Sequence, residues 1–110
     1  MKIIAEIGLN HCGSIDRGKK LVQDLNKTSI DAISFQIREK SFYDKTHPRK
    51  CELPISFYRD VIDQIHIADK GICIAIAEPE MIDKMNEIGV DMFKIGSGEC
   101  NNLPLIEEIS

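Results

Sequence analysis

The stretch with the clearest chemistry runs from Phe93 to Asn102 and reads FKIGSGECNN. Its apolar start predicts a strand, because the apolar run is too short for a helix. The Gly-Ser-Gly that follows can turn tightly and present backbone N–H groups to an anion. Asn101 and Asn102 are good N-cap residues for a helix that begins near Leu103. A strand, a glycine turn and a helix start together predict a site for a phosphate-sized anion.

Lys94 lies inside this predicted strand, and a lysine among apolar strand residues is costly to bury unless it is paired or binds a ligand. Side chains alternate along strands, so Glu6 and Gln36 in two earlier predicted strands can meet Lys94 at the carboxyl ends. Ligands bind at these ends in parallel α/β folds. Two interpretations follow: a structural Glu6–Lys94 ion pair inside the sheet, or a ligand site in which Lys94 and the Gly96–Gly98 turn hold an anion.

His11, Cys12 and Cys100 also follow predicted strands at the same end of the sheet. A single loop histidine more often forms ordinary hydrogen bonds than takes part in catalysis, so its position alone leaves both roles open. Neither cysteine has a neighbouring base in the sequence, and we interpret both as unreactive. None of the three histidines has metal-ligand spacing, and no CxxC pair occurs, so we expect reduced thiols.

The composition is that of a soluble globular protein with one domain: 110 residues, 43% hydrophobic, 29% charged and a net charge of −4. This charge gives no basic field for nucleic acid. The apolar runs are too short to span a membrane. Met1 leads almost at once into a predicted strand, which leaves no room for a signal peptide, so we expect a cytoplasmic protein.

Apolar strands alternate with amphipathic helices along the chain, and this order predicts a parallel sheet covered by helices. The predicted strands are Lys2–Leu9, Ala32–Ile37, Ile72–Ala77 and the stretch that starts at Met92. The predicted helices are Ile15–Asn26, one that Pro54 opens and Gly71 closes, one between Glu78 and Gly89, and one near Leu103. The polar segment from Arg38 to Leu53 lacks periodicity, so we predict a long loop there.

Two long motifs resemble the sialic acid synthase (N-acetylneuraminate synthase) family. Residues 5–13 (AEIGLNHCG) resemble its AEIGxNHxG signature, and residues 93–106 (FKIGSGECNNLPLI) resemble its KIGSGExxNxPLI signature. The resemblance implies a (β/α)8 TIM barrel followed by a small antifreeze-like domain. Such a barrel needs about 250 residues. We therefore expect residues 1–110 to form its first four βα units, the N-terminal half, with the second half and the antifreeze-like domain outside this chain.

The resemblance also implies an activity. The family condenses phosphoenolpyruvate with N-acetylmannosamine or a related amino sugar, giving a nine-carbon sialic acid and phosphate. It uses a divalent metal, manganese or magnesium, whose histidine ligands come from later strands. By resemblance the catalytic candidates are Glu6, His11 and Glu99, and the substrate-binding candidates are Asn10, Gln36, Lys94 and Ser97.

Two positions depart from the family pattern. Ser34 replaces a lysine that helps to bind phosphoenolpyruvate, and Ala77-Glu78-Pro79 replaces a Ser-Thr-Pro-Phe turn. The site therefore loses a cation and a hydroxyl and gains a carboxylate. One lost charge-assisted contact typically costs about 1.5–3 kcal/mol, so we expect weakened phosphate binding.

A second function class stays open. Four strands of a barrel leave two sheet edges and an apolar face uncovered. The chain is then a non-catalytic half-barrel, a binding or assembly module that associates with itself or with a separate second half.

Overall fold

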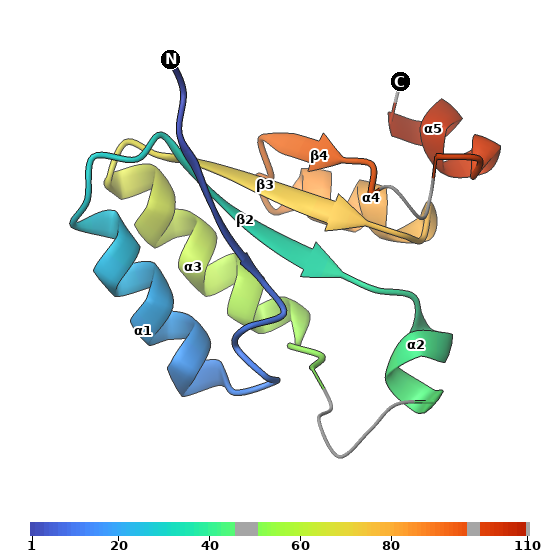
Figure 1. The fold of residues 1–110 in the computed structure, drawn as a ribbon, viewed down its shortest axis with the longest axis horizontal. Helices are drawn as coiled ribbons and strands as arrows, with labels where there is room; N and C mark the ends of the chain where they lie inside the picture. Colours follow the sequence, from blue (N-terminus) through green and yellow to red (C-terminus); the bar gives the residue numbers. More distant parts are fainter. Residues whose placement is uncertain (46–50, 97–99, 110) are drawn as a thin grey trace.

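The computed structural model describes residues 1–45, 51–96 and 100–109, which form parallel strands alternating with helices (Figure 1). The strands are β1 (Ile4–Gly8), β2 (Ala32–Ile37), β3 (Gly71–Ile76) and β4 (Met92–Lys94). The helices are α1 (Ile15–Asn26), α2 (Lys40–Lys45), α3 (Ile55–Ile67), α4 (Glu80–Glu87) and α5 (Leu103–Ile109). Each strand pairs in parallel with the next, in the order β1-β2-β3-β4, which confirms the predicted parallel α/β architecture.

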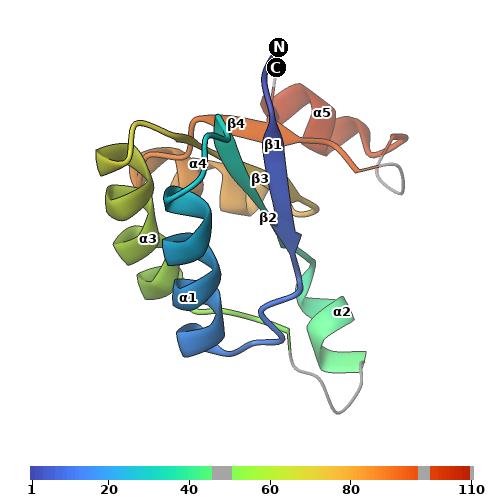
Figure 2. The ribbon, with the colours of Figure 1, turned by 60° about the vertical axis from the view of Figure 1, so that its left-hand side comes forward.

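The sheet has one face covered by helices and one open face. α1 and α3 lie side by side against the covered face (Figure 2), where Ile33, Phe35 and Ile74 have no exposed surface. Residues at the alternate positions point the other way. On this open face Ile4 of β1 and Met92 of β4 remain 49% and 41% exposed. The alternation of side chains therefore separates an apolar core from the face that carries the candidate site.

The helix boundaries follow local signals. α1 has the predicted bounds, and its N-cap Ser14 accepts a hydrogen bond through Oγ from the backbone N–H of Arg17 at 3.1 Å. α3 begins directly after Pro54, as predicted. Asn102 precedes α5 and accepts a bond from the N–H of Leu105 at 3.3 Å, which confirms its predicted capping role.

The prediction of a continuous loop from Arg38 to Leu53 is wrong in its first part, where α2 forms. Tyr43 stabilises this short helix: its side chain is 8% exposed, and its hydroxyl accepts a bond from the backbone N–H of Arg38 at 2.9 Å. One buried aromatic ring leaves no periodic pattern in six residues, so the helix depends on a contact that periodicity does not reveal. Residues 46–50 of the same predicted loop lie outside the described residues.

None of the helices in the described ranges is both long and apolar enough to cross a lipid bilayer.

Gly18 allows α1 to approach α3 closely. A Cβ atom added at Gly18 would lie 2.7 Å from Cζ of Phe57, well inside van der Waals contact. The Phe57 ring is 1% exposed and packs edge-on against Phe35, with ring centroids 5.7 Å apart. Since interiors are close-packed, this ring has little room to move. The packing of the two helices therefore requires a residue without a side chain at position 18.

We expect Gly18→Ala to lower the free energy of unfolding by about 1–3 kcal/mol. Overpacking against Phe57 should outweigh the gain of about 1 kcal/mol that alanine gives in a helix. Urea unfolding followed by circular dichroism measures the difference. The matched control is Gln23→Ala at an exposed position of α1, which should stay within about 0.5 kcal/mol of the unmodified chain. A Gly18→Ala chain more stable than the unmodified one would contradict this packing.

Candidate active site

The register of the strands arranges the side chains of the open face in rows across the sheet. The first row crosses the middle of β1, β2 and β3 and holds Glu6, Ser34, Cys73 and, at the start of β4, Met92. The second row, two residues closer to the carboxyl ends, holds Gln36, Ala75 and Lys94. Residues paired across parallel strands point to the same face. The predicted site residues of β1, β2 and β4 thus share one surface.

Glu6 and Lys94 approach each other across this surface. Nζ of Lys94 lies 3.8 Å from Oε2 of Glu6, although their strands are separated by β2 and β3. The two side chains are 46% and 58% exposed, so the pair lies in solvent on the open face. An exposed ion pair contributes only about 0–1 kcal/mol. Both charged groups are therefore available to a ligand, and Gln36 lies between their strands on β2.

His11 lies on the other side of the sheet from this pair. Its ring has no exposed surface and lies 6.4 Å from the ring of Phe35, which is part of the covered core. Its Nδ1 accepts a hydrogen bond from the N–H of Gly13 at 3.0 Å, so a neutral ring carries its proton on Nε2. Burial lowers the pKa of His11. The hydrogen bond between His11 and Gly13 thus stabilises the turn after β1.

The remaining candidates lie in the loops. Asn10 is exposed in the turn after β1, where its backbone N–H donates to the carbonyl of Ile7 at 3.0 Å. Ser97 and Glu99 lie outside the described residues, so their proposed roles stay predictions. Cys12 and Cys100 are exposed, and all four cysteines are free.

Cys73 and Ser34 occupy the centre of the first row. Ser34 stands at the position of a lysine in the family pattern, but Cys73 is not among the site residues predicted from the sequence. Cys73 and Ser34 are 6% and 1% exposed. Burial raises the pKa of the Cys73 thiol, which the neighbouring Ser34 hydroxyl opposes in part, so the thiol is a weak nucleophile at neutral pH. The signal that could have found Cys73 is strand alternation, which places it on the same face as Gly71 and Ala75.

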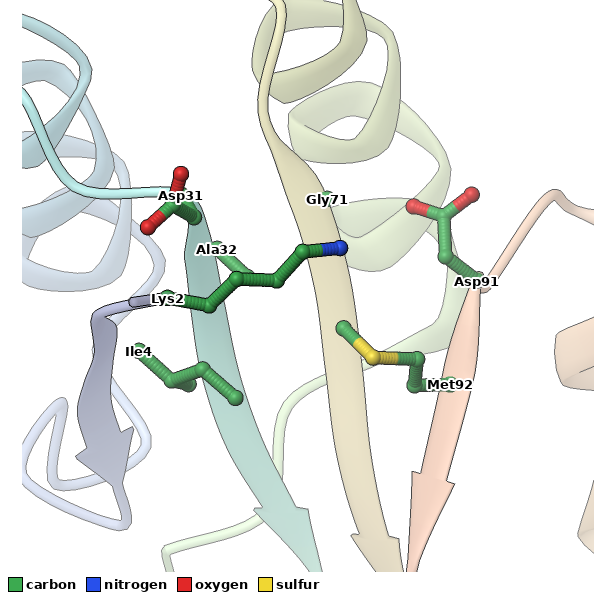
Figure 3. A pocket seen from close by; sticks show the side chains of 7 residues that line it. All are labelled: Lys2, Ile4, Asp31, Ala32, Gly71, Asp91 and Met92. Atoms are coloured by element: carbon green, nitrogen blue, oxygen red, sulfur yellow. The ribbon is translucent and has the colours of Figure 1, made fainter.

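A pocket of about 330 Å³ lies at the opposite end of the sheet (Figure 3). Its lining includes the first residue of every strand: Ile4, Ala32, Gly71 and Met92. The two carboxylates that line it accept hydrogen bonds from the backbone. Asp31 accepts one from the N–H of Ile3 at 2.6 Å, and Asp91 accepts one from the N–H of Ile72 at 2.9 Å. Polar groups at the amino ends of barrel strands usually serve stability. The carboxyl ends of the strands therefore remain the better candidate for a ligand site.

Within the described residues, no three side chains of His, Cys, Asp or Glu gather closely enough to hold a metal ion. This part of the chain does not fit the divalent metal that the family resemblance implies. The roles proposed below are accordingly roles in binding and positioning.

The buried imidazole should make stability depend on pH. In the unfolded chain His11 takes up a proton as the pH falls through about 6.5, whereas the folded chain does so only at lower pH. The unfolded state then binds more protons, so the free energy of unfolding should fall between pH 7.5 and 5.5. Urea unfolding at both pH values should show a smaller fall in His11→Gln. An NMR titration of the His11 ring in the unmodified chain gives its pKa directly, and a value at or above 6.5 would contradict the prediction.

Comparison with known proteins supports the resemblance. No family model matches the sequence. An uncharacterized protein of Methanocaldococcus jannaschii is 36% identical over 98% of this chain and 34% of its own length. The N-acetylneuraminate-9-phosphate synthase of Mus musculus is 32% identical over 96% of this chain and 35% of its own length. The chain thus spans about a third of the length of these relatives.

The fold has a close counterpart among solved structures. The sialic acid synthetase of Leptospira borgpetersenii superposes with a TM-score of 0.84 over 96% of this chain and 39% of that one. Its identity of 21% makes this evidence for the fold alone. The four strands and their helices therefore have the arrangement found in a TIM-barrel synthase. Together with the sequence similarity to curated synthases along nearly the whole chain, this confirms the resemblance to the sialic acid synthase family over about a third of the length of those proteins.

Proposed function

We propose that this chain supplies the first four βα units of a barrel that condenses phosphoenolpyruvate with N-acetylmannosamine or a related amino sugar. The products are a nine-carbon sialic acid and phosphate. The observation that carries the proposal is the exposed Glu6–Lys94 pair at 3.8 Å on the open face. It lies near the carboxyl ends of the strands, where barrel enzymes bind their substrates.

Lys94, Gln36 and Glu6 each have a binding role that suits the chemistry of their side chains. The ammonium of Lys94 binds the phosphate or carboxylate of phosphoenolpyruvate, and the side-chain amide of Gln36 donates to the same ligand. The carboxylate of Glu6 accepts hydrogen bonds from the sugar. Since the exposed ion pair contributes at most about 1 kcal/mol, and a charge-assisted bond to a ligand about 1.5–3 kcal/mol, the anion can separate Lys94 from Glu6.

The remaining family roles complete the proposal. Ser97 contacts the same anion as Lys94, and Glu99 faces the sugar or the reacting carbons. Asn10 and His11 shape the loop after β1, in which His11 holds Gly13. Manganese or magnesium would be bound by histidines outside this chain.

Lys94→Met should weaken the binding of phosphoenolpyruvate by about tenfold or more, because it removes one charge-assisted contact. Isothermal titration of the chain with phosphoenolpyruvate measures this. The matched control is Lys84→Met, an exposed lysine of α4, which should bind like the unmodified chain. Equal losses in both variants would mean that the anion responds only to net charge, and the site would have to lie elsewhere.

We expect no release of phosphate when the chain alone is mixed with phosphoenolpyruvate, manganese and N-acetylmannosamine, because its described residues do not fit a metal. A colorimetric phosphate assay detects turnover. Sustained turnover by the purified chain would show that the metal site has been misplaced.

The open face also favours a second function, that of an assembly module. Ile4 and Met92 are exposed on it, and within the described residues β1 and β4 each pair with one strand only. Parallel sheets are normally covered on both faces. A second copy that joins its β1 to this β4, and its β4 to this β1, would complete eight parallel strands.

Such a module should form dimers at micromolar concentration. At each joint the Glu6 of one copy would come beside the Lys94 of the other. Glu6→Lys and Lys94→Glu should each shift the population toward monomer, and the double variant should restore the dimer. Multi-angle light scattering measures the mass. A stable monomer would rule out self-association and leave only pairing with a separate second half.

A further inference from the structure

Glu78 has a partner that its sequence position does not suggest. It follows β3, in the turn where the family resemblance implies a ligand-contacting hydroxyl, and a carboxylate there was expected to oppose the anion. In the structure Oε1 of Glu78 accepts a hydrogen bond from the backbone N–H of Lys40 at 2.7 Å. Lys40 is the first residue of α2, so Glu78 satisfies one of the N–H groups that a helix start leaves without a helical partner.

This hydrogen bond directs the Glu78 carboxylate toward the β2 side of β3. The strand lies between β2 and β4 in the sheet. Lys40 follows β2, whereas Lys94, the cation of the proposed anion site, belongs to β4. Glu78 therefore reaches toward β2 and away from Lys94. A carboxylate held in this way adds less repulsion to the anion than its place in the sequence suggests.

A second bond completes the attachment of this segment. The hydroxyl of Tyr43 in α2 accepts from the N–H of Arg38, directly after β2. Burial raises the pKa of Tyr43, so the hydroxyl stays neutral at physiological pH. The first turn of α2 is thus bonded to the end of β3, and its last turn to the end of β2. Around these bonds lies a pocket of about 250 Å³, lined by Ile37, Arg38, Lys40, Tyr43, Asp44, Glu52, Glu78 and Met81.

We propose that Glu78 is a positioning residue for the anion site. Its carboxylate fixes α2 against the end of β3 and so forms the wall of the site on the β2 side. This wall begins at Arg38, two residues after Gln36. In the proposed function the side-chain amide of Gln36 donates a hydrogen bond to the anion. The inference rests on that function for its effect on binding, but the attachment of α2 can be tested separately.

Two variants distinguish positioning from repulsion. Glu78→Gln removes the charge and keeps an oxygen that can accept from Lys40, whereas Glu78→Ala removes both. If Glu78 positions α2, Glu78→Ala should speed amide hydrogen exchange at Lys40 about tenfold and weaken phosphoenolpyruvate binding several-fold, and Glu78→Gln should restore both to within about twofold. NMR gives the exchange rate, and isothermal titration with phosphoenolpyruvate gives the affinity.

The matched control is Glu80→Ala, an exposed carboxylate at the start of α4, which should change neither quantity. Tighter phosphoenolpyruvate binding in both Glu78 variants, with unchanged exchange at Lys40, would mean that the carboxylate simply repels the anion and would overturn the proposal. Unchanged exchange in Glu78→Ala would overturn it as well. If the unmodified chain binds no phosphoenolpyruvate, the proposed function fails, while the exchange rates still decide whether Glu78 holds α2.

Discussion

The burial of one face of the parallel sheet under α1 and α3 is the constraint on which the other features depend. Ile33, Phe35 and Ile74 take the covered face because their side chains are apolar, and the alternation of a strand then sends the intervening residues to the open face. Glu6 and Lys94 meet there as a consequence. A slip of one residue in any strand would exchange the two faces, so the packing of the core also fixes where the polar groups point.

The charge balance of the candidate site differs from the balance that the sequence suggests. Ser34 places a neutral, buried hydroxyl where the family pattern has a lysine, so Lys94 lacks that neighbour. Glu78 has the opposite sign, but its carboxylate bonds to the start of α2. We therefore expect the loss of the cation to weaken anion binding, whereas the Glu78 carboxylate is hydrogen-bonded within the fold. An anion of low charge, or one bound with help from the rest of a barrel, suits this arrangement.

Much of the fold could be predicted because its signals are local. The apolar run of β2 and the periodicity of α1 give their observed bounds, and Ser14, Pro54 and Asn102 mark helix starts through their own side chains. The convergence of Glu6 and Lys94 could be predicted as well, since it needs only the alternation of strands and a shared direction. α2 could not, because its stability comes from one buried ring and from a carboxylate 38 residues away.

Residue types and their spacing are enough to predict the parallel α/β fold, the family resemblance and the set of polar candidates. These signals come from residues that are close together in the sequence: the alternation along each strand and two long motifs. Tertiary packing decides what these candidates do. It turns His11 into the core, where burial favours a neutral ring, and it leaves Glu6 and Lys94 in solvent. It also directs Glu78 to a helix start rather than to the anion site. These outcomes depend on contacts between distant segments, whose geometry exists only once the sheet has folded against its helices.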